Sequence, residues 1–227
     1  MHKEEYEIEL LQNVNDDLER EILSNTKTVE FQKGNLPFFN DDLLDYFYIV
    51  IDGRIKAYQI NLDTSKEQTL FIYRQGDMLD TMILLDSKPH ELLYEALDKT
   101  KVMQIPLHVV RNWMYNNTEF KKKFFPYLAS QLRHYEELSS DLSLLDTSHR
   151  FVKLLLQNED TTNRFKYKLL KNLSNSEIAK LLGTVRHVVE RHIKELKDKN
   201  LITKSRSNIS IKKIENLLQK TKQMLLK

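Results

Sequence analysis

The stretch that decides the fold is SNSEIAKLLGTVRHVVERHIKELKDKNLI, residues 174–202. Ser174 is followed three residues later by Glu177, a spacing that is typical of a capping box at the first turn of a helix. Gly183 is typical of the position just past a helix end. A second helical pattern follows within a few residues, over residues 186–199. The stretch therefore predicts two helices joined by a tight turn.

The second of these helices has two unlike faces at about 100° per residue. One face carries mainly apolar side chains: Val189, His192, Ile193 and Leu196. The other carries polar and mostly basic side chains: Arg186, His187, Glu190, Arg191 and Lys194. Such a helical pair fits a DNA major groove, because arginine can bond bidentately to guanine. An ordinary helical hairpin with a solvated basic face is the alternative.

Two short strands around a polar, basic turn are predicted next, in residues 201–211 (LITKSRSNISI). A hairpin in this place makes the C-terminal fold a winged helix-turn-helix. The amphipathic, basic run 211–227 (IKKIENLLQKTKQMLLK) is expected to pack on the winged domain with its lysines outward. A membrane-surface or partner helix is the alternative for that run.

Upstream, residues 29–107 have the texture of an antiparallel β domain. Short β-branched and aromatic runs (YFYIVI, RIKAYQI, TLFIYR and KVMQIPL) alternate with turn signals. Gly34, Gly53 and Gly76 fall at these turns, where a positive φ is favourable only for glycine. Residues 5–24 have helix-like spacing and predict short N-terminal helices.

A long helix is predicted over residues 118–145. Its apolar positions repeat in alternating threes and fours and form one seam: Leu128, Leu132, Tyr135, Leu138, Leu142 and Leu145. The seam favours a dimer helix, and packing of the stripe on the chain's own β domain is the alternative. Pro126 is expected in the first turn or at a kink. The run Asp146-Thr147-Ser148 predicts a break before the next helix.

Charge divides the chain at that break. Residues 1–146 hold 16 Lys and Arg against 26 Asp and Glu, a net charge of −10, whereas residues 147–227 hold 19 against 7, a net charge of +12. We therefore expect an α+β chain of two domains with different partners: the β domain with its N-terminal helices at 1–117, the long helix at 118–145 and the winged domain at 146–227.

Composition excludes several classes of protein. The 227 residues are 41% hydrophobic and 30% charged, which is typical of a globular chain. The absence of cysteine excludes disulfides, thiolate zinc sites and cysteine-ligated iron–sulfur clusters. No phosphate loop or hydrolase motif predicts an enzyme, and no metal site is predicted. With no signal peptide and no apolar run near the roughly 20 residues of a membrane span, we expect a cytoplasmic protein without a membrane partner.

The chain resembles the Crp/Fnr family of transcription regulators over nearly its whole length. The stretches that carry the resemblance are VEFQKGNLPFFNDDLLDYFYIVIDGRIKAY, FIYRQGDMLD, DLSLLDTSHR and, most specifically, residues 174–202. The resemblance implies an N-terminal sensor β-roll (a double-stranded β-helix), a central dimerisation helix and a homodimer on a palindromic double-stranded operator. RNA polymerase would be a further partner if the protein is an activator.

The resemblance also implies which residues meet DNA. Arg186, His187 and Arg191 occupy base-reading positions. The positions expected near the DNA backbone are Ser174, Asn175, Ser176, Val185 and Val188, together with Thr184, Lys194, Lys204 and Arg206. His187 replaces a glutamate that is common in the family, and a neutral imidazole cannot reproduce a carboxylate that accepts from cytosine. Val185 cannot cap the recognition helix as a serine would, so Thr184 is expected to do so.

An effector pocket is expected in the β-roll, at Asp80, Thr81, Met82, His90, Glu91 and Leu92, with His134 from the long helix. Cyclic-nucleotide binders of the family hold the phosphate with an arginine and a Ser or Thr, where this chain has Glu91 and Leu92. A carboxylate repels a phosphate, so cyclic AMP is disfavoured. Haem, with His90, His108, His134 or Met82 as axial donor, another apolar effector, and no effector all stay open.

A competing hypothesis from another class is a ligand-binding or protein-interaction module. Its basic C-terminal domain would then bind an acidic protein instead of DNA. Preference for one duplex sequence over its scramble discriminates between the two.

Overall fold

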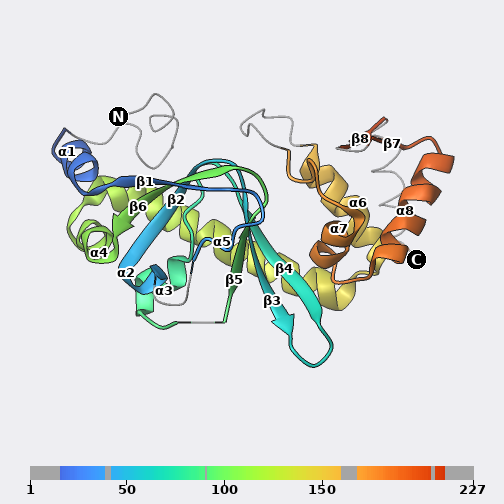
Figure 1. Cartoon of the computed structure of the whole chain (residues 1–227), viewed down its shortest axis with the longest axis horizontal. Coiled ribbons are helices and arrows are strands. Elements are labelled where there is room, and N and C mark those ends of the chain that lie inside the picture. Colours follow the sequence, from blue (N-terminus) through green and yellow to red (C-terminus); the bar gives the residue numbers. More distant parts are fainter. Residues whose placement is uncertain (1–15, 39–41, 90, 160–167, 206–207, 213–227) are drawn as a thin grey trace. The chain divides into compact units, whose positions relative to one another are not determined.

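The structure is a computed structural model, and it describes residues 16–38, 42–89, 91–159, 168–205 and 208–212. The chain forms two compact units. The first consists of residues 1–59 and 71–134, and the second of residues 60–70 and 135–227. The expected fold class is confirmed: an antiparallel β domain, a long helix and a C-terminal helix-turn-helix follow one another along the chain (Figure 1).

The N-terminal elements lie mainly in the first unit and are built on two three-stranded sheets. The sheets have the orders β1-β6-β2 and β4-β3-β5 (Figure 1). Their strands are β1 (Lys27–Phe31), β2 (Tyr46–Asp52), β3 (Ile55–Asn61), β4 (Lys66–Tyr73), β5 (Leu93–Ala96) and β6 (Thr100–Pro106). The helices are α1 (Asp16–Asn25), α2 (Asp42–Asp45), α3 (Thr81–Asp86), α4 (Leu107–Asn116) and α5 (Thr118–Leu144).

Strand β2 lies at the centre of the core. It pairs antiparallel with β6, with Ile49 opposite Met103. Five consecutive β2 residues, 47–51, are buried, so the strand is covered on both faces. A strand buried on both faces needs a continuous apolar run in place of alternation, which explains the YFYIVI sequence.

A buried ion pair closes the turn between β2 and β3. Arg54 is fully buried, and its guanidinium donates to both carboxylate oxygens of Asp98, with Nε–Oδ2 at 2.6 Å and Nη2–Oδ1 at 3.2 Å. The Thr100 hydroxyl donates to the Arg54 carbonyl at 3.2 Å. A buried charge is tolerated only when it is paired in this way, so the pair fixes the path of the chain at Gly53.

The second unit contains the predicted helical pair and hairpin. Its elements are α6 (Thr147–Asn158), α7 (Asn175–Leu181), α8 (Arg186–Asp198), β7 (Ile202–Lys204) and β8 (Ile209–Ile211). The two strands pair antiparallel, with Ile202 opposite Ile211. Residues 1–15 of the expected N-terminal helices and residues 213–227 of the C-terminal run lie outside the described residues. Within the described ranges, no helix is long and apolar enough to cross a membrane.

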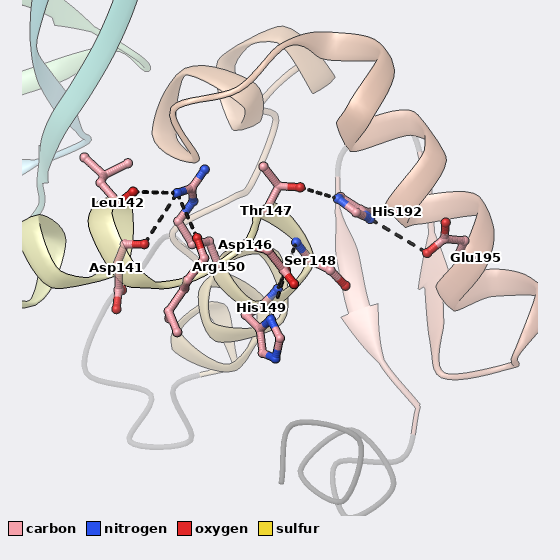
Figure 2. Close-up of polar contacts among 10 residues, drawn as sticks. Asp141, Leu142, Asp146, Thr147, Ser148, His149, Arg150, His192 and Glu195 are labelled. Carbon is pink, nitrogen blue, oxygen red and sulfur yellow. Dashed lines mark hydrogen bonds and ion pairs between the residues drawn. The ribbon is translucent and has the colours of Figure 1, made fainter. Parts of the chain in front are cut away.

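The break between α5 and α6 is a set of interlocking polar contacts (Figure 2). Asp146 caps α6 as predicted, because its Oδ1 accepts from the backbone N–H groups of Ser148 at 2.8 Å and His149 at 2.9 Å. Arg150 Nη1 donates back to the carbonyls at the end of α5: Asp141 at 3.4 Å, Leu142 at 3.2 Å and Leu145 at 3.1 Å. One side chain thus supplies donors to carbonyls in the last turn of α5 and just beyond it, of which the Asp141 carbonyl also accepts from the Leu145 N–H at 3.1 Å.

His192 joins this break to the recognition helix (Figure 2). A hydrogen bond links its Nε2 to Thr147 Oγ1 at 2.9 Å, and its Nδ1 lies 3.8 Å from Glu195 Oε2. His192 is only 6% exposed. Burial lowers the pKa of the His192 imidazole, which favours the neutral ring.

Pro126 lies in the interior of α5, so of the two expected places, the first turn and a kink, the first is wrong and the second stays a prediction. The proline has no N–H to donate to the carbonyl one turn earlier, yet the helix continues to Leu144.

All four glycines have positive φ, as expected for the three turns of the β domain.

Substitution of two of these glycines by alanine separates the cost of backbone strain from the cost of a steric clash. A Cβ at Gly53 would lie 2.5 Å from Thr100 Oγ1 and 2.8 Å from the Lys99 carbonyl oxygen, whereas a Cβ at Gly76 would meet nothing within 4 Å. Gly76→Ala should cost about 1 to 2 kcal/mol of unfolding free energy from backbone strain alone. Gly53→Ala should cost roughly 1 to 3 kcal/mol more, because the backbone of residues 99 and 100 must move. Equal urea midpoints for the two variants would contradict this account.

The pH dependence of stability should reveal the buried imidazole of His192. Since its folded pKa is lowered, the unfolded chain binds more protons near its usual pKa of about 6.5, and stability is lost as the pH falls through that region. We expect His192→Gln to reduce the difference in urea midpoint between about pH 7 and about pH 5. His108→Gln, which alters an exposed histidine of α4, should keep the wild-type difference. An unchanged difference in His192→Gln would show that another group is responsible.

Candidate nucleic-acid interface

The start and end of α7 set the angle at which the recognition helix follows. Ser174 Oγ accepts from the Glu177 N–H at 3.2 Å, and Glu177 Oε2 accepts from the Ser174 N–H at 2.7 Å, which completes the predicted capping box. After the helix, Gly183 has a φ of +64°. The Thr184 N–H donates to the Ala179 carbonyl at 2.9 Å. This is the Schellman pattern, in which a left-handed residue reverses the chain directly after the helix.

The C-terminal end of α8 has the same Schellman pattern, with an asparagine in place of the glycine. Asn200 has a φ of +55°, its N–H donates to the Lys197 carbonyl at 2.8 Å, and the Leu201 N–H donates to the Leu196 carbonyl at 2.9 Å. Leu201 and Leu196 are both buried, as is common at such ends. The chain is thereby directed into the β7–β8 hairpin, which is the predicted wing.

The N-terminus of α8 corrects one expectation. Its cap position is Val185, whose side chain makes no cap hydrogen bond. Thr184 lies one residue before the cap position, and among the described residues no hydrogen bond from the first turn of α8 to its hydroxyl is formed. The first turn of α8 therefore has no side-chain cap.

The two faces of α8 divide as predicted. Val189, His192, Ile193 and Leu196 are buried. Arg186, His187, Arg191 and Lys194 are exposed, with 69% of the Arg186 and 62% of the Arg191 side chain accessible. The predicted base-reading side chains thus share an accessible face, and their roles stay a prediction.

The other residues predicted to meet DNA differ in exposure. Ser174, Ser176 and Val185 are exposed, whereas Asn175, Thr184, Val188 and Lys204 are half-buried. Arg206 lies outside the described residues. Ser174 uses its oxygen lone pair in the capping box, which leaves its O–H free to donate.

A carboxylate that was not singled out as a site residue lies at the centre of this surface. Glu190 Oε1 accepts from Arg186 Nε at 2.6 Å and from Asn175 Nδ2 at 3.3 Å. Lys204 Nζ from the wing donates to Asn175 Oδ1. The Arg186 hydrogen bond holds the pKa of the Glu190 carboxyl below its usual value. Burial lowers the pKa of Lys204, and the charge of Glu190 opposes that shift.

The residues predicted for the effector pocket have varied surroundings. Asp80 is buried and caps α3, where it accepts from the Ile83 N–H at 3.4 Å and from the Tyr94 hydroxyl at 2.8 Å. Thr81 is buried, Leu92 is half-buried and Glu91 is exposed. His90 lies outside the described residues. Asp80 therefore already has a structural role.

Three of the candidate haem ligands lie on three different helices. Met82 is 48% exposed on α3, and His108 is exposed on α4. His134 on α5 packs edge-on against Phe71, with ring centroids 4.7 Å apart. Among the described residues, no group of three or more His, Asp or Glu side chains could hold a metal ion.

The residues of the predicted seam differ in exposure. Leu132 is 62% exposed, whereas Leu128, Tyr135, Leu138, Leu142 and Leu145 are half-buried. Leu128 packs against the core of the β domain. Phe125, nearby on α5, is 52% exposed. The seam therefore has one well-exposed member, Leu132.

Comparison with known proteins agrees with this architecture. Residues 28–117 match the cyclic nucleotide-binding domain, and residues 149–220 match the Crp-like helix-turn-helix domain. The chain is 23% identical to the CRP-like cAMP-activated global transcriptional regulator of Mycobacterium tuberculosis, over 86% of this chain and 88% of that protein. FixK2 from Bradyrhizobium japonicum has a similar fold, with a TM-score of 0.72 and 21% identity over 86% of this chain and 96% of that one.

A CooA variant from Carboxydothermus hydrogenoformans is also similar, with a TM-score of 0.73 and 18% identity over 93% of this chain and 97% of that one. Other curated relatives that match are named as a global nitrogen regulator, from Synechococcus elongatus, and an anaerobic regulatory protein, from Haemophilus influenzae. The two matching domains, in this order and on this fold, show that the chain belongs to the Crp/Fnr family of transcription regulators.

Proposed function

We propose that the protein is a homodimer that binds a palindromic DNA operator sequence-specifically. The observation that carries this proposal is the outward face of α8. Two well-exposed arginines, Arg186 and Arg191, lie on that face, while the opposite face is buried. Guanidinium groups held on a rigid helix can each bond bidentately to a guanine in the major groove.

Specific and general contacts should come from different residues. We assign base reading to Arg186, His187 and Arg191. We assign backbone contacts to residues at the rim, of which Lys194 and Lys204 neutralise phosphates and release counterions. His187 offers a ring nitrogen where the family has a carboxylate, so the middle of each half-site should differ from the operators of relatives with glutamate there.

The dimer should form through α5. The exposed apolar seam around Leu132 is suited to a second copy of the same helix. Two-fold symmetry then places the two recognition helices about one helical turn of DNA apart, roughly 34 Å, on a palindrome.

A small effector in the β-roll is the further part of the proposal. The Mycobacterium tuberculosis relative is named as cAMP-activated. In this chain Glu91, an exposed carboxylate, lies near the position of the arginine that would hold the phosphate, so we propose an effector other than cyclic AMP.

We place the protein in the cytoplasm and propose the domain bounds 1–117, 118–145 and 146–227. We expect RNA polymerase as a partner only if the protein activates transcription.

The test is selection from a randomised duplex pool by the purified, ligand-free protein at physiological salt. Enrichment of a palindrome is the expected result. Binding that is equal for all sequences and disappears with salt would instead favour the rival function, a basic module for an acidic protein partner. If nothing is enriched, repeating the selection with haem and nitric oxide separates a missing effector from a wrong assignment.

On the selected operator, Arg191→Ala and Lys194→Ala should behave differently. Arg191→Ala should cost about 1 to 3 kcal/mol and relax the preference at one base pair of each half-site, because a bidentate contact is lost. Lys194→Ala should weaken specific and scrambled duplexes alike. Fluorescence anisotropy titrations on both duplexes measure these effects. Equal losses on both duplexes for both variants would remove Arg191 from the base-reading residues.

The dimer seam can be tested with two charged substitutions on α5. Leu132→Glu places a carboxylate in the seam and should yield monomers, since an unpaired charge cannot be buried at the interface. Leu144→Glu is the control: Leu144 is 80% exposed, and at about 100° per residue it lies opposite the seam residue Tyr135. Light scattering should report a dimer for the wild type and for Leu144→Glu. A monomeric wild type, or a dimeric Leu132→Glu, would rule out this interface.

A further inference from the structure

Glu190 lies among the basic residues of the outward face of α8. A carboxylate on a surface that meets phosphates repels every DNA sequence equally. Its side chain is 42% exposed, so it is not required to fill the core. Its position therefore calls for an explanation beyond packing.

The stability of the free helix does not explain Glu190. The Arg186–Glu190 pair spans four residues with the arginine first, which is the less favourable order along a helix. The arginine is 69% exposed, and exposed ion pairs contribute little to folding. Any role of the Arg186–Glu190 ion pair must therefore lie in something other than the stability of the fold.

The geometry of the Arg186 hydrogen bond suggests what that is. Glu190 Oε1 binds the Nε of Arg186 at 2.6 Å. The guanidinium is planar and rigid, so a hydrogen bond at Nε fixes its plane and leaves the two terminal amino groups free to donate. Those two groups are the ones that bond to O6 and N7 of guanine.

The other arginine of the face is not held in this way. Arg191 Nε lies 3.9 Å from Glu195 Oε1, beyond hydrogen-bond distance, although the spacing along the helix is the same. Two arginine–glutamate pairs on one helix thus differ in geometry, and the difference provides an internal control.

The same carboxylate connects three elements. Asn175, the first residue of α7, donates to Glu190 Oε1 and accepts from Lys204 of the wing. A chain of polar contacts therefore runs from β7 through α7 to α8. The orientation of Arg186 depends on groups that are also tied to the wing.

We propose that Glu190 is a specificity-determining positioning residue, which orients Arg186 for guanine and joins the recognition helix to the wing through Asn175 and Lys204. The assignment rests on the proposed DNA-binding function. It predicts that Glu190 lowers affinity for all DNA and at the same time sharpens the choice of one base pair.

Four variants of the full chain test it by selection from the randomised pool: Glu190→Ala, Glu190→Asp, Glu195→Ala and Arg186→Ala. Glu190→Asp keeps the charge but shortens the reach to Arg186. Glu195→Ala removes the same charge from the same helix without touching Arg186. Thermal unfolding of each variant provides the check that it remains folded.

We expect Glu190→Ala and Glu190→Asp to lose the preference at the same base pair as Arg186→Ala, a discrimination of about 10- to 100-fold for a bidentate contact. Glu190→Ala should also bind scrambled DNA more tightly than the wild type, and Glu190→Asp should not. Glu195→Ala should keep the wild-type preference.

Several outcomes overturn the inference. Wild-type base preference in both Glu190 variants, or relaxation at a base pair other than the one that Arg186 reads, would show that Glu190 does not position Arg186. Relaxation in Glu195→Ala to the same extent would assign the effect to charge alone. If the wild-type protein itself enriches no sequence with or without effector, the proposed function fails first, and the inference falls with it.

Discussion

The recognition surface depends on two left-handed helix ends, at Gly183 and Asn200. Each reverses the chain within one residue, the first before α8 and the second after it. Because both ends are closed by backbone hydrogen bonds, the start and the exit of α8 are fixed independently of any side chain on its outer face. The side chains of Arg186 and Arg191 are therefore not needed to hold α8 in place. Val189 and Leu196 are buried and pack the helix on the core.

Charge is used differently in the two units of the chain. In the β domain, Arg54 is fully buried and bonds to both oxygens of Asp98, so the pair is required to remove the cost of a buried charge. On the outward face of α8, the side chains of Arg186 and Glu190 are 69% and 42% exposed, so separating this ion pair costs little. The Arg54–Asp98 pair therefore fixes a turn of the fold. The Arg186–Glu190 pair can separate, so that its side chains can bind other groups.

The parts of the fold that the sequence predicts are those set by local signals. The capping box at Ser174 and the helix end at Gly183 each depend on residues within about one helical turn. The apolar face of α8 follows from the spacing of residues along that one helix. The position of Pro126 and the role of Thr184 depend on neighbours: α5 continues through the proline, which therefore lies beyond the first turn, and α8 has Val185 and not Thr184 at its cap position. Asp80 likewise meets Tyr94 from another strand. The hydrogen bonds from Glu190 through Asn175 to Lys204 connect three elements that are distant in sequence. The four-residue spacing of Arg186 and Glu190 could have indicated their ion pair, but not the contacts with Asn175 and Lys204.

An acidic residue in a basic face has a physical rationale once specificity is treated as a ratio of affinities. A regulator must distinguish its operator from a large excess of other sequences, so affinity that is shared by all DNA contributes nothing to the choice. The carboxylate of Glu190 lowers that shared affinity and, by holding Arg186 at Nε, restricts where the guanidinium finds partners. The +12 net charge of residues 147–227 supplies ample general attraction to DNA. The chain can therefore give up some of this attraction at Arg186, one of the positions proposed to read a base.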